Sequence, residues 1–252
     1  KSSNSSKVSN YSMSFDGSDK INCGNDSILN LTSTISLSAW VKPTTAITSQ
    51  DFPMFIAKGL NSDYMLFANS GTGTARMRLG SSFLIDSTST IPTNVWTHIV
   101  GTYDGVTLKI YVNGVSENPT SQTGAIPSTS GNLQMGSANN GNKFTGKIDH
   151  VAIFDYALSS SQVTALYGNS TDGVGNPMAI TGGRKPIAYY PIGDYAAFNG
   201  SEYLVNNGAL QDYVFDFGAA NAGSEYINAP TDIGGFTKCS TSAWINPSSV
   251  SA

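Results

Sequence analysis

The chain has 252 residues and a composition that excludes several classes of protein. Charged residues make up only 12% of it, the formal net charge is -4, and glycine occurs 26 times. The 13 lysines and arginines form no run, which argues against nucleic acid as a partner because nucleic-acid affinity rests on clustered cations. No stretch approaches the roughly 20 apolar residues of a membrane span. The composition therefore predicts a globular protein with a polar, turn-rich surface.

Strand patterns recur along the first two thirds of the chain, with turn residues between them. The clearest is TISLSAWVK, which alternates apolar and polar residues from Thr34 to Lys42. This pattern and the number of strands predict an all-β fold, a two-sheet antiparallel sandwich. The other predicted strands are Tyr11–Phe15, Lys20–Cys23, Phe52–Lys58, Asp63–Ala68, Ala75–Gly80, Val95–Tyr103, Thr107–Val112, Asn132–Gly136 and Lys147–Phe154.

Turn and helix signals complete this unit. Asp104-Gly105 and Asn113-Gly114 each lie between apolar runs and supply the positive φ angles of hairpin turns. Only the segment from Ser159 to Gly168 has a helical pattern, with a serine as its cap and a glycine as its stop.

The end of the chain repeats its beginning after about two hundred residues, which is too long for a solenoid repeat of roughly 20 to 45 residues. Residues 169–186 are rich in glycine and lack periodicity. We therefore expect one unit at 1–168, a linker or long loop at 169–186, and the truncated first part of a second unit at 187–252. An alternative is that Ile187 to Gly193 also replaces an equivalent strand that would precede Lys1. The echoing positions are Tyr11 and Tyr213, Phe15 and Phe217, Ile21 and Ile227, and Trp40 and Trp244.

Four strings carry a family resemblance: YSMSFDGSDKINCG, ISLSAWVKPT, VWTHIVGTYDGVTLKIYVNGV and FTGKIDHVAIFDYALSSSQVTALY. In this order they resemble the laminin-G-like domains of the concanavalin-A-like lectin/glucanase superfamily. The resemblance covers roughly residues 11–168, and the tail from Ile187 resembles the start of the same family. It implies a jelly-roll sandwich, followed by the first strands of a second copy, whose concave face or rim loops bind carbohydrate or protein. Tandem copies with such a surface also resemble fibre, tail and adhesion proteins of phages and bacteria.

Catalytic motifs are absent from the sequence. Glycan-cleaving enzymes of this superfamily usually carry two carboxylates on one strand as Glu-x-Asp-x-x-Glu, and the only glutamates here are Glu117, Glu202 and Glu225. The two histidines, His98 and His150, lie in strand patterns without the partners of a catalytic triad or a zinc site. We therefore expect no enzyme and no catalytic residues, and we expect His98 to be a packed histidine with its polar tip bonded.

A structural calcium ion is the cofactor that the resemblance implies. The family often binds it with backbone carbonyls near the first strand and an aspartate on the last, which Asp149 of GKIDHV matches. Asp16 and Asp19 follow the first predicted strand and could join it, since calcium prefers oxygen ligands. Both are explained equally well as turn residues.

Ligand contacts are expected from aromatic rings stacked on sugar rings, although core packing explains most aromatic residues as well. The candidates are Trp40, Tyr64, Phe83 and Trp96, with Arg76 and Arg78 as hydrogen-bond donors.

These observations predict a non-catalytic recognition or adhesion module that binds carbohydrate or a cell-surface protein. Neighbouring copies of the same domain are its expected partners within a larger extracellular, cell-surface or virion protein. The alternative is a structural spacer domain of a fibre or virion that has no ligand of its own. A glycoside hydrolase is a third hypothesis and requires two carboxylates in one cleft.

Overall fold

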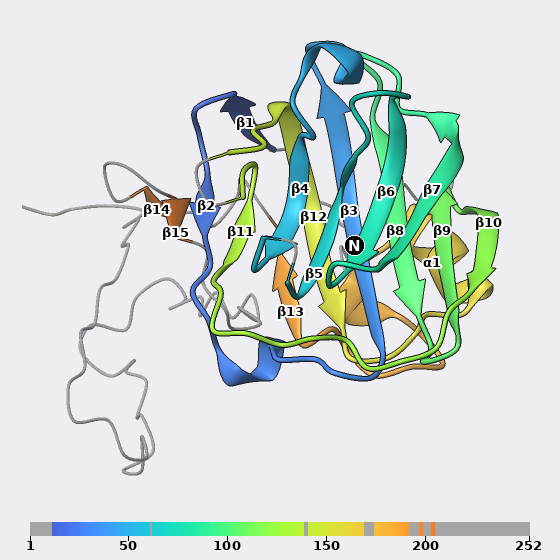
Figure 1. Ribbon diagram of the computed structural model, residues 1–252. Coiled ribbons are helices and arrows are strands. Elements are labelled where there is room, and N and C mark those ends of the chain that lie inside the picture. Colours follow the sequence, from blue (N-terminus) through green and yellow to red (C-terminus); the bar gives the residue numbers. More distant parts are fainter. Residues whose placement is uncertain are drawn as a thin grey trace, which may run out of the picture. The chain divides into compact units, whose positions relative to one another are not determined.

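The computed structural model describes residues 12–60, 62–138, 141–168 and 174–191, and the backbone of 197–198 and 203–204. These residues form two β-sheets packed face to face (Figure 1), which confirms the predicted sandwich. Residues 169–173 of the predicted linker lie outside the described residues, as does the predicted second unit at 192–196, at 199–202 and beyond position 204. No helix in the described part of the chain is long and apolar enough to cross a membrane.

The first sheet, sheet A, is antiparallel throughout. Its order is β1 (Met13–Asp16), β12 (Thr145–Phe154), β3 (Ile35–Pro43), β8 (Thr97–Tyr103), β9 (Thr107–Val112) and β10 (Val115–Ser121). A further strand, β13 (Ala188–Tyr190), also pairs with β12.

The second sheet, sheet B, is antiparallel except for the pairing of β15 with β2. Its order is β14 (Ala197–Phe198), β15 (Tyr203–Leu204), β2 (Ile21–Asn22), β11 (Leu133–Met135), β4 (Met54–Lys58), β5 (Tyr64–Ala68), β6 (Thr74–Leu79) and β7 (Phe83–Thr90). Among the described residues, the 3-10 helices η1 (Ser27–Leu29) and η2 (Ile47–Ser49) lie between strands of the two sheets, and η3 (Pro177–Ala179) lies between α1 and β13.

The core lies between the two sheets and follows the alternation of the sequence. In β3, the apolar set that includes Leu37 and Val41 is fully buried and belongs to one cluster with Leu66 and Met77 of sheet B. Burial of each such side chain contributes about 1.5–3 kcal/mol to folding. Side chains at alternate positions, such as Trp40, therefore lie on the outer face of sheet A.

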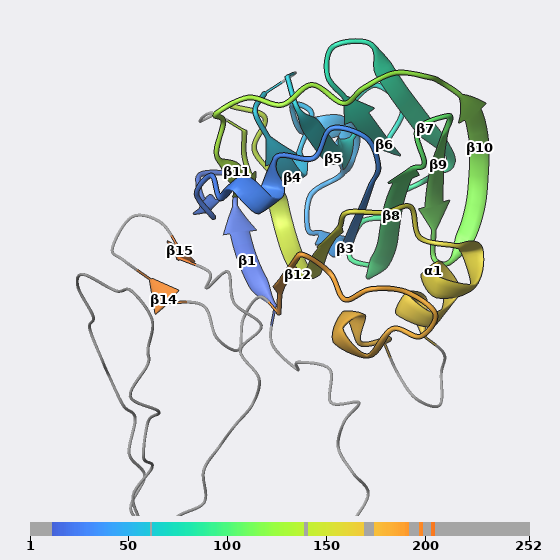
Figure 2. The same cartoon turned by 90° about the horizontal axis from the view of Figure 1, so that it is seen from below.

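A helix covers the outer face of sheet A. Helix α1 (Ser160–Tyr167) begins at the expected capping serine, where Ser159 and Gln162 each accept a hydrogen bond from the other's backbone N–H. It ends at Gly168, whose φ of 80° suits glycine. Val163 and Leu166 pack against apolar side chains of β8, β9 and β12. Figure 2 shows α1 on the side of sheet A that faces away from β4 to β7.

The chain after the helix stays on this side of the sandwich. The described residues 174–186, expected as linker or long loop, contact the first unit through the Tyr156 hydroxyl, which donates to the Arg184 carbonyl at 2.9 Å. The Ile187 N–H then donates to the Ile153 carbonyl at 2.8 Å, and β13 begins. Tyr190 is fully buried in the core. The lead strand predicted from Ile187 thus supplies an edge strand to the first sandwich.

Within residues 1–168, the described strands β7 and β10 were not predicted. Both lie at sheet edges, and β10 is exposed along almost its whole length. Its sequence, VSENPTS, has no apolar alternation, and Pro119 lies in a β-bulge between Glu117 and Thr120. Edge strands tolerate proline and polar residues because one side of the strand makes no ladder hydrogen bonds.

Candidate functional site

The residues predicted to contact a ligand are divided between the two sheets, with Arg78 on β6 and Phe83 on β7 of sheet B. Trp40 on β3 and the half-buried Trp96 before β8 belong to sheet A, whereas Tyr64 and Arg76 belong to sheet B. Tyr64 points into the core, is 1% exposed, and donates its hydroxyl to the Leu29 carbonyl at 3.2 Å. In this position its ring has no face available to a sugar.

Trp40 is part of a packed aromatic cluster on the outer face of sheet A. Its ring stacks on His98 at 5.0 Å and on Tyr167 of α1 at 5.7 Å between centroids. The His98 Nε2 atom hydrogen-bonds the Ser38 hydroxyl at 2.9 Å, as expected of a packed histidine. Burial, helped by the nearby His150, lowers the pKa of His98 to about 3. The cluster therefore holds a neutral imidazole beneath the end of the helix.

The three aspartates predicted to bind calcium do not come together. Asp16 pairs with Thr145, four residues before Asp149 on β12, a separation of roughly 13 Å along a strand. Asp16 and Asp19 accept hydrogen bonds from backbone N–H groups of their own turn. Asp149 instead lies 2.8 Å from His150 Nδ1. Among the described residues no group of three metal-ligating side chains gathers. A calcium ion shared by all three does not fit this geometry, and calcium binding remains a prediction.

The outer face of sheet B carries a different cluster. A cross-strand row runs from Met54 on β4 through Phe67 on β5 and Arg76 on β6 to Asp86 on β7. Residues in such a row point to the same face of a sheet. No helix among the described residues lies on this face, in contrast to sheet A. We refer to Phe52, Phe67, Asn69, Arg76 and Asp86 as the outer-face site.

An ion pair forms the centre of the outer-face site. Arg76 Nε donates to Asp86 Oδ1 at 2.6 Å and Nη2 donates to Oδ2 at 2.7 Å, the bidentate geometry that is the strongest for this pair. Hydrogen bonding to the carboxylate raises the pKa of Arg76. The guanidinium also lies 5.8 Å from the centroid of the buried Phe67 ring. Both side chains remain partly exposed, 19% for Arg76 and 32% for Asp86.

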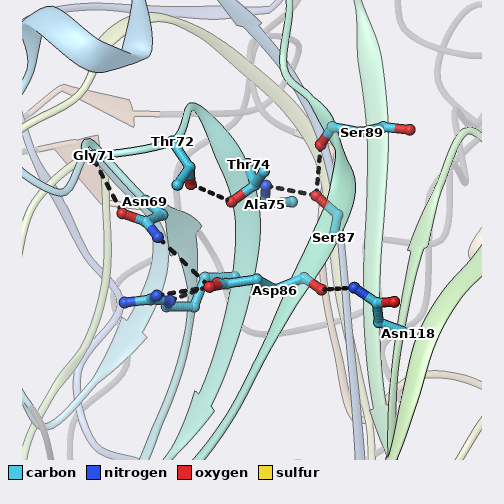
Figure 3. Close-up of polar contacts among 10 residues, drawn as sticks. Asn69, Gly71, Thr72, Thr74, Ala75, Asp86, Ser87, Ser89 and Asn118 are labelled. Carbon is cyan, nitrogen blue, oxygen red and sulfur yellow. Dashed lines mark hydrogen bonds and ion pairs between the residues drawn. The ribbon is translucent and has the colours of Figure 1, made fainter.

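Two asparagines extend the polar cluster (Figure 3). The Asn69 side-chain amide lies 3.5 Å from Asp86 Oδ2, and its carbonyl accepts from the Gly71 N–H, which fixes the amide's orientation. On the other side, the exposed Asn118 of β10 donates to the backbone carbonyl of Asp86 at 3.2 Å. Amide groups from the loop after β5 and from β10 thus lie on either side of Asp86.

Phe52 contributes the exposed aromatic surface. Its ring is 36% exposed and lies 6.3 Å from that of Phe67. Its φ is 43°, a left-handed conformation that is unusual for a bulky side chain. Strained residues of this kind cluster at functional sites, where the surrounding structure holds them in place.

Sequence reasoning identified Arg76 in this site but missed Phe52, Asn69 and Asp86 as site residues. Phe52 was assigned to a strand, which in fact begins at Met54, and Asp86 lies on the unpredicted strand β7. The alternation Ile85 inward and Asp86 outward is present in FLIDS and was the available signal. The arrangement can stack a ring on Phe52 and hydrogen-bond hydroxyl groups beside it.

A family model described as the concanavalin A-like lectin/glucanases superfamily matches residues 15–164, more than half of the chain. The chain belongs to this superfamily. Its laminin-G-like sandwich therefore agrees with the resemblance noted in the sequence. No curated protein matches the chain.

Solved structures of the same fold include glycan-bound domains. A Bacteroides ovatus protein has 18% identity and a TM-score of 0.58 over 77% of this chain, which covers 55% of that protein. Domain 4 of AbnA, an extracellular arabinanase from Geobacillus stearothermophilus, was solved with arabinotriose and shares 25% identity, with a TM-score of 0.51 over 61% of this chain and 74% of that one. The CBM40 domain of the Ruminococcus gnavus IT-sialidase, bound to α2,3 sialyllactose, has 15% identity and a TM-score of 0.53 over 63% of this chain and 97% of that one.

Proposed function

We propose that this laminin-G-like sandwich is a non-catalytic carbohydrate-binding module and that the outer-face site holds the glycan. The observation that carries the proposal is the exposed ring of Phe52 next to Phe67, over which Arg76 of the Arg76–Asp86 pair lies, on the side of the sandwich opposite α1. The arabinotriose bound to AbnA domain 4 and the sialyllactose bound to the CBM40 domain support it, because both domains share the fold.

The chemistry of the site suits a sugar ring. The apolar face of a pyranose or furanose can stack on Phe52, which would bury aromatic surface that is now in contact with water. The Asp86 contacts engage Nε and Nη2 of Arg76, so Nη1 is the guanidinium nitrogen outside that pair. Together with the Asn69 amide and the Asp86 carboxylate, it supplies donors and acceptors for ring hydroxyls.

The carboxylates near the site argue for binding rather than hydrolysis. Asp86 is ion-paired, and Glu117 accepts four hydrogen bonds from the backbone and hydroxyl groups of Thr88 and Ser89. Partial burial would raise the pKa of Glu117, but these hydrogen bonds outweigh it and lower the pKa. A carboxyl group that stays ionised cannot act as the general acid that glycoside hydrolysis requires.

The proposal includes a setting in which glycans are available, at a cell surface or outside the cell. A module of this kind would attach a larger protein to a glycan-bearing surface. Neighbouring copies of the domain, including the predicted second unit, would raise the avidity of such attachment without any new contact.

The test is glycan binding by the chain and by two variants of Phe52. We expect Phe52→Ala to weaken binding about ten-fold, because an aromatic contact contributes roughly 0.5–1.5 kcal/mol beyond its buried area. Phe52→Tyr keeps the ring and should bind like the parent chain. Binding would be located on a glycan array and then measured by calorimetry.

Tyr167→Ala is the matched control, because Tyr167 is equally exposed but lies over sheet A. It should leave glycan affinity unchanged. Equal affinities of Phe52→Ala and the parent chain would overturn the proposed site. The absence of any bound glycan on a broad array would overturn the proposed function.

A further inference from the structure

We infer that the outer-face site selects neutral glycans and that Asp86 is the residue that disfavours sugars bearing a carboxylate. This inference rests on the proposed function and concerns the ligand class of the same site. It starts from the charge balance around Phe52, which differs from what an acidic sugar needs.

An acidic sugar is recognised best by an arginine that offers a free two-nitrogen edge to the sugar carboxylate. In the outer-face site, that edge of Arg76 is already occupied by Asp86 through the contacts at 2.6 and 2.7 Å. A ligand carboxylate would have to displace Asp86 or approach beside it. Displacement would leave the Asp86 charge unpaired and in repulsion with the ligand.

Arg78 does not take over this role. It lies two residues further along β6, on the same face, and its Nε donates to the Gly80 carbonyl at 3.1 Å. Its Nη2 donates to the Ser81 carbonyl at 2.8 Å. These contacts hold the Arg78 guanidinium at the turn between β6 and β7. The guanidinium that lies over Phe67, the neighbour of Phe52, is that of Arg76.

The remaining charged groups near the site balance each other. The exposed Asp51 precedes Phe52, and Glu117 precedes Asn118, whose amide bonds the Asp86 backbone. On the positive side, Lys143 follows Asn142, whose carbonyl accepts from the Met54 N–H. Among these described residues, the cations are Arg76, Arg78 and Lys143, and the anions are Asp51, Asp86 and Glu117, so the two charges are equal in number. The site therefore has no excess positive charge to attract an acidic ligand.

This charge balance favours one of the two kinds of glycan that were found with domains of similar fold. Arabinotriose, found with AbnA domain 4, carries only hydroxyl groups, whereas sialyllactose, found with the CBM40 domain, carries a carboxylate. An oligosaccharide with one ring stacked on Phe52 and hydroxyls of another ring directed at Asp86, two strands away from Phe67, fits the first kind. Asp86 would accept hydrogen bonds from hydroxyl groups and repel a carboxylate at the same position.

The experiment compares neutral oligosaccharides with their sialylated or uronate-bearing counterparts on one array, with lactose and 3′-sialyllactose as a matched pair in solution. The full chain should bind its best neutral ligand at least about ten-fold more tightly than the acidic counterpart. Asp86→Asn keeps the shape and an acceptor for Arg76 but removes the charge. It should reduce this preference about ten-fold by gaining affinity for the acidic member.

Asp155→Asn is the matched control, because it removes one carboxylate from another arginine pair, Asp155 with Arg184 at 2.9 Å. It should leave the preference unchanged. A parent chain that binds acidic glycans as well as or better than neutral ones would overturn this inference and leave the proposed function standing. An array without any bound glycan would overturn both.

A second measurement covers the case in which Asp86→Asn does not fold. Binding of the preferred glycan to the parent chain should change less than two-fold between about 50 and about 500 mM salt, because no net charge is paired across the interface. A steep loss of affinity with salt would contradict a neutral ligand.

Discussion

At the scale of single residues, His98 shows how burial determines protonation. The imidazole is 1% exposed, stacks on Trp40 and bonds the Ser38 hydroxyl. Among the described residues, its buried Nδ1 has no hydrogen-bond partner, so a proton added there would have no acceptor in the protein. The folded state therefore favours the neutral form strongly.

This environment predicts a specific loss of stability in acid. The unfolded chain protonates His98 at a pKa near 6.5, and burial lowers the folded pKa to about 3. Below about pH 6.5 the unfolded state thus binds the proton and the folded state does not, so stability falls as the pH drops toward about 3, by up to several kcal/mol. Urea unfolding at several pH values would measure this slope.

His98→Gln is the comparison, because an amide can still bond Ser38 but does not titrate. The difference in unfolding free energy between the two proteins should narrow as the pH falls from 7 to 4. A difference that stays constant over this range would show that His98 titrates normally.

At the scale of elements, β13 extends the sandwich beyond the predicted unit boundary. Its three residues pair with Val151, Ala152 and Ile153 of β12, beyond the half of β12 that pairs with β1. Tyr190 then enters the core beside Cys23. The Cys23 thiol is buried there, and its desolvation raises its pKa to about 12. Strand β13 is thus part of the same core as β1.

Replacement of Tyr190 should destabilise the first sandwich. Tyr190→Ala removes a fully buried aromatic side chain and should cost about 3 kcal/mol, as large-to-small core substitutions do. Calorimetric Tm measurements on the full chain would detect a decrease of several degrees. Val106→Ala, at a position that is 56% exposed, should change Tm by less than one degree. Equal effects of both variants would show that β13 does not pack on this core.

Some elements were predictable and others were not, for identifiable reasons. Strand β3 and helix α1 carry strong local signals, because one face of each is buried and the helix has both of its caps in sequence. Strands β7 and β10 lack such a signal, since edge strands face water and are stabilised by partners far away in the sequence. Because Asp86 lies on β7, the central ion pair of the outer-face site could not be predicted from Arg76 alone.

At the scale of the whole molecule, the two outer faces of the sandwich differ in what covers them. Sheet A is covered by α1 and by residues 174–187, which bury its apolar outer side chains. On the outer face of sheet B, Met54 and Phe67 are at most 3% exposed, whereas Phe52, Arg76 and Asp86 keep partly exposed side chains.

A non-catalytic module should release no product from the glycans that it binds. Incubation of the chain with its array ligands and with aryl glycosides should yield no new reducing ends above the buffer blank, from about pH 4 to about pH 8, the range in which paired carboxylates would act. The Glu117→Gln variant serves as the control for trace activity. Hydrolysis that this variant or Asp86→Asn abolishes would contradict the proposal.

The sequence by itself determined the fold class, the order of most strands, the closing helix and the superfamily, because these depend on periodicity and on motifs that are local. It also excluded the usual glucanase motif through its few glutamates. Only the tertiary structure decided which side chains meet: it buried Tyr64, separated Asp16 from Asp149, and placed Arg76 against Asp86 and Phe67. Cross-strand contacts depend on register and on which face of a sheet is covered, and neither is encoded within one segment.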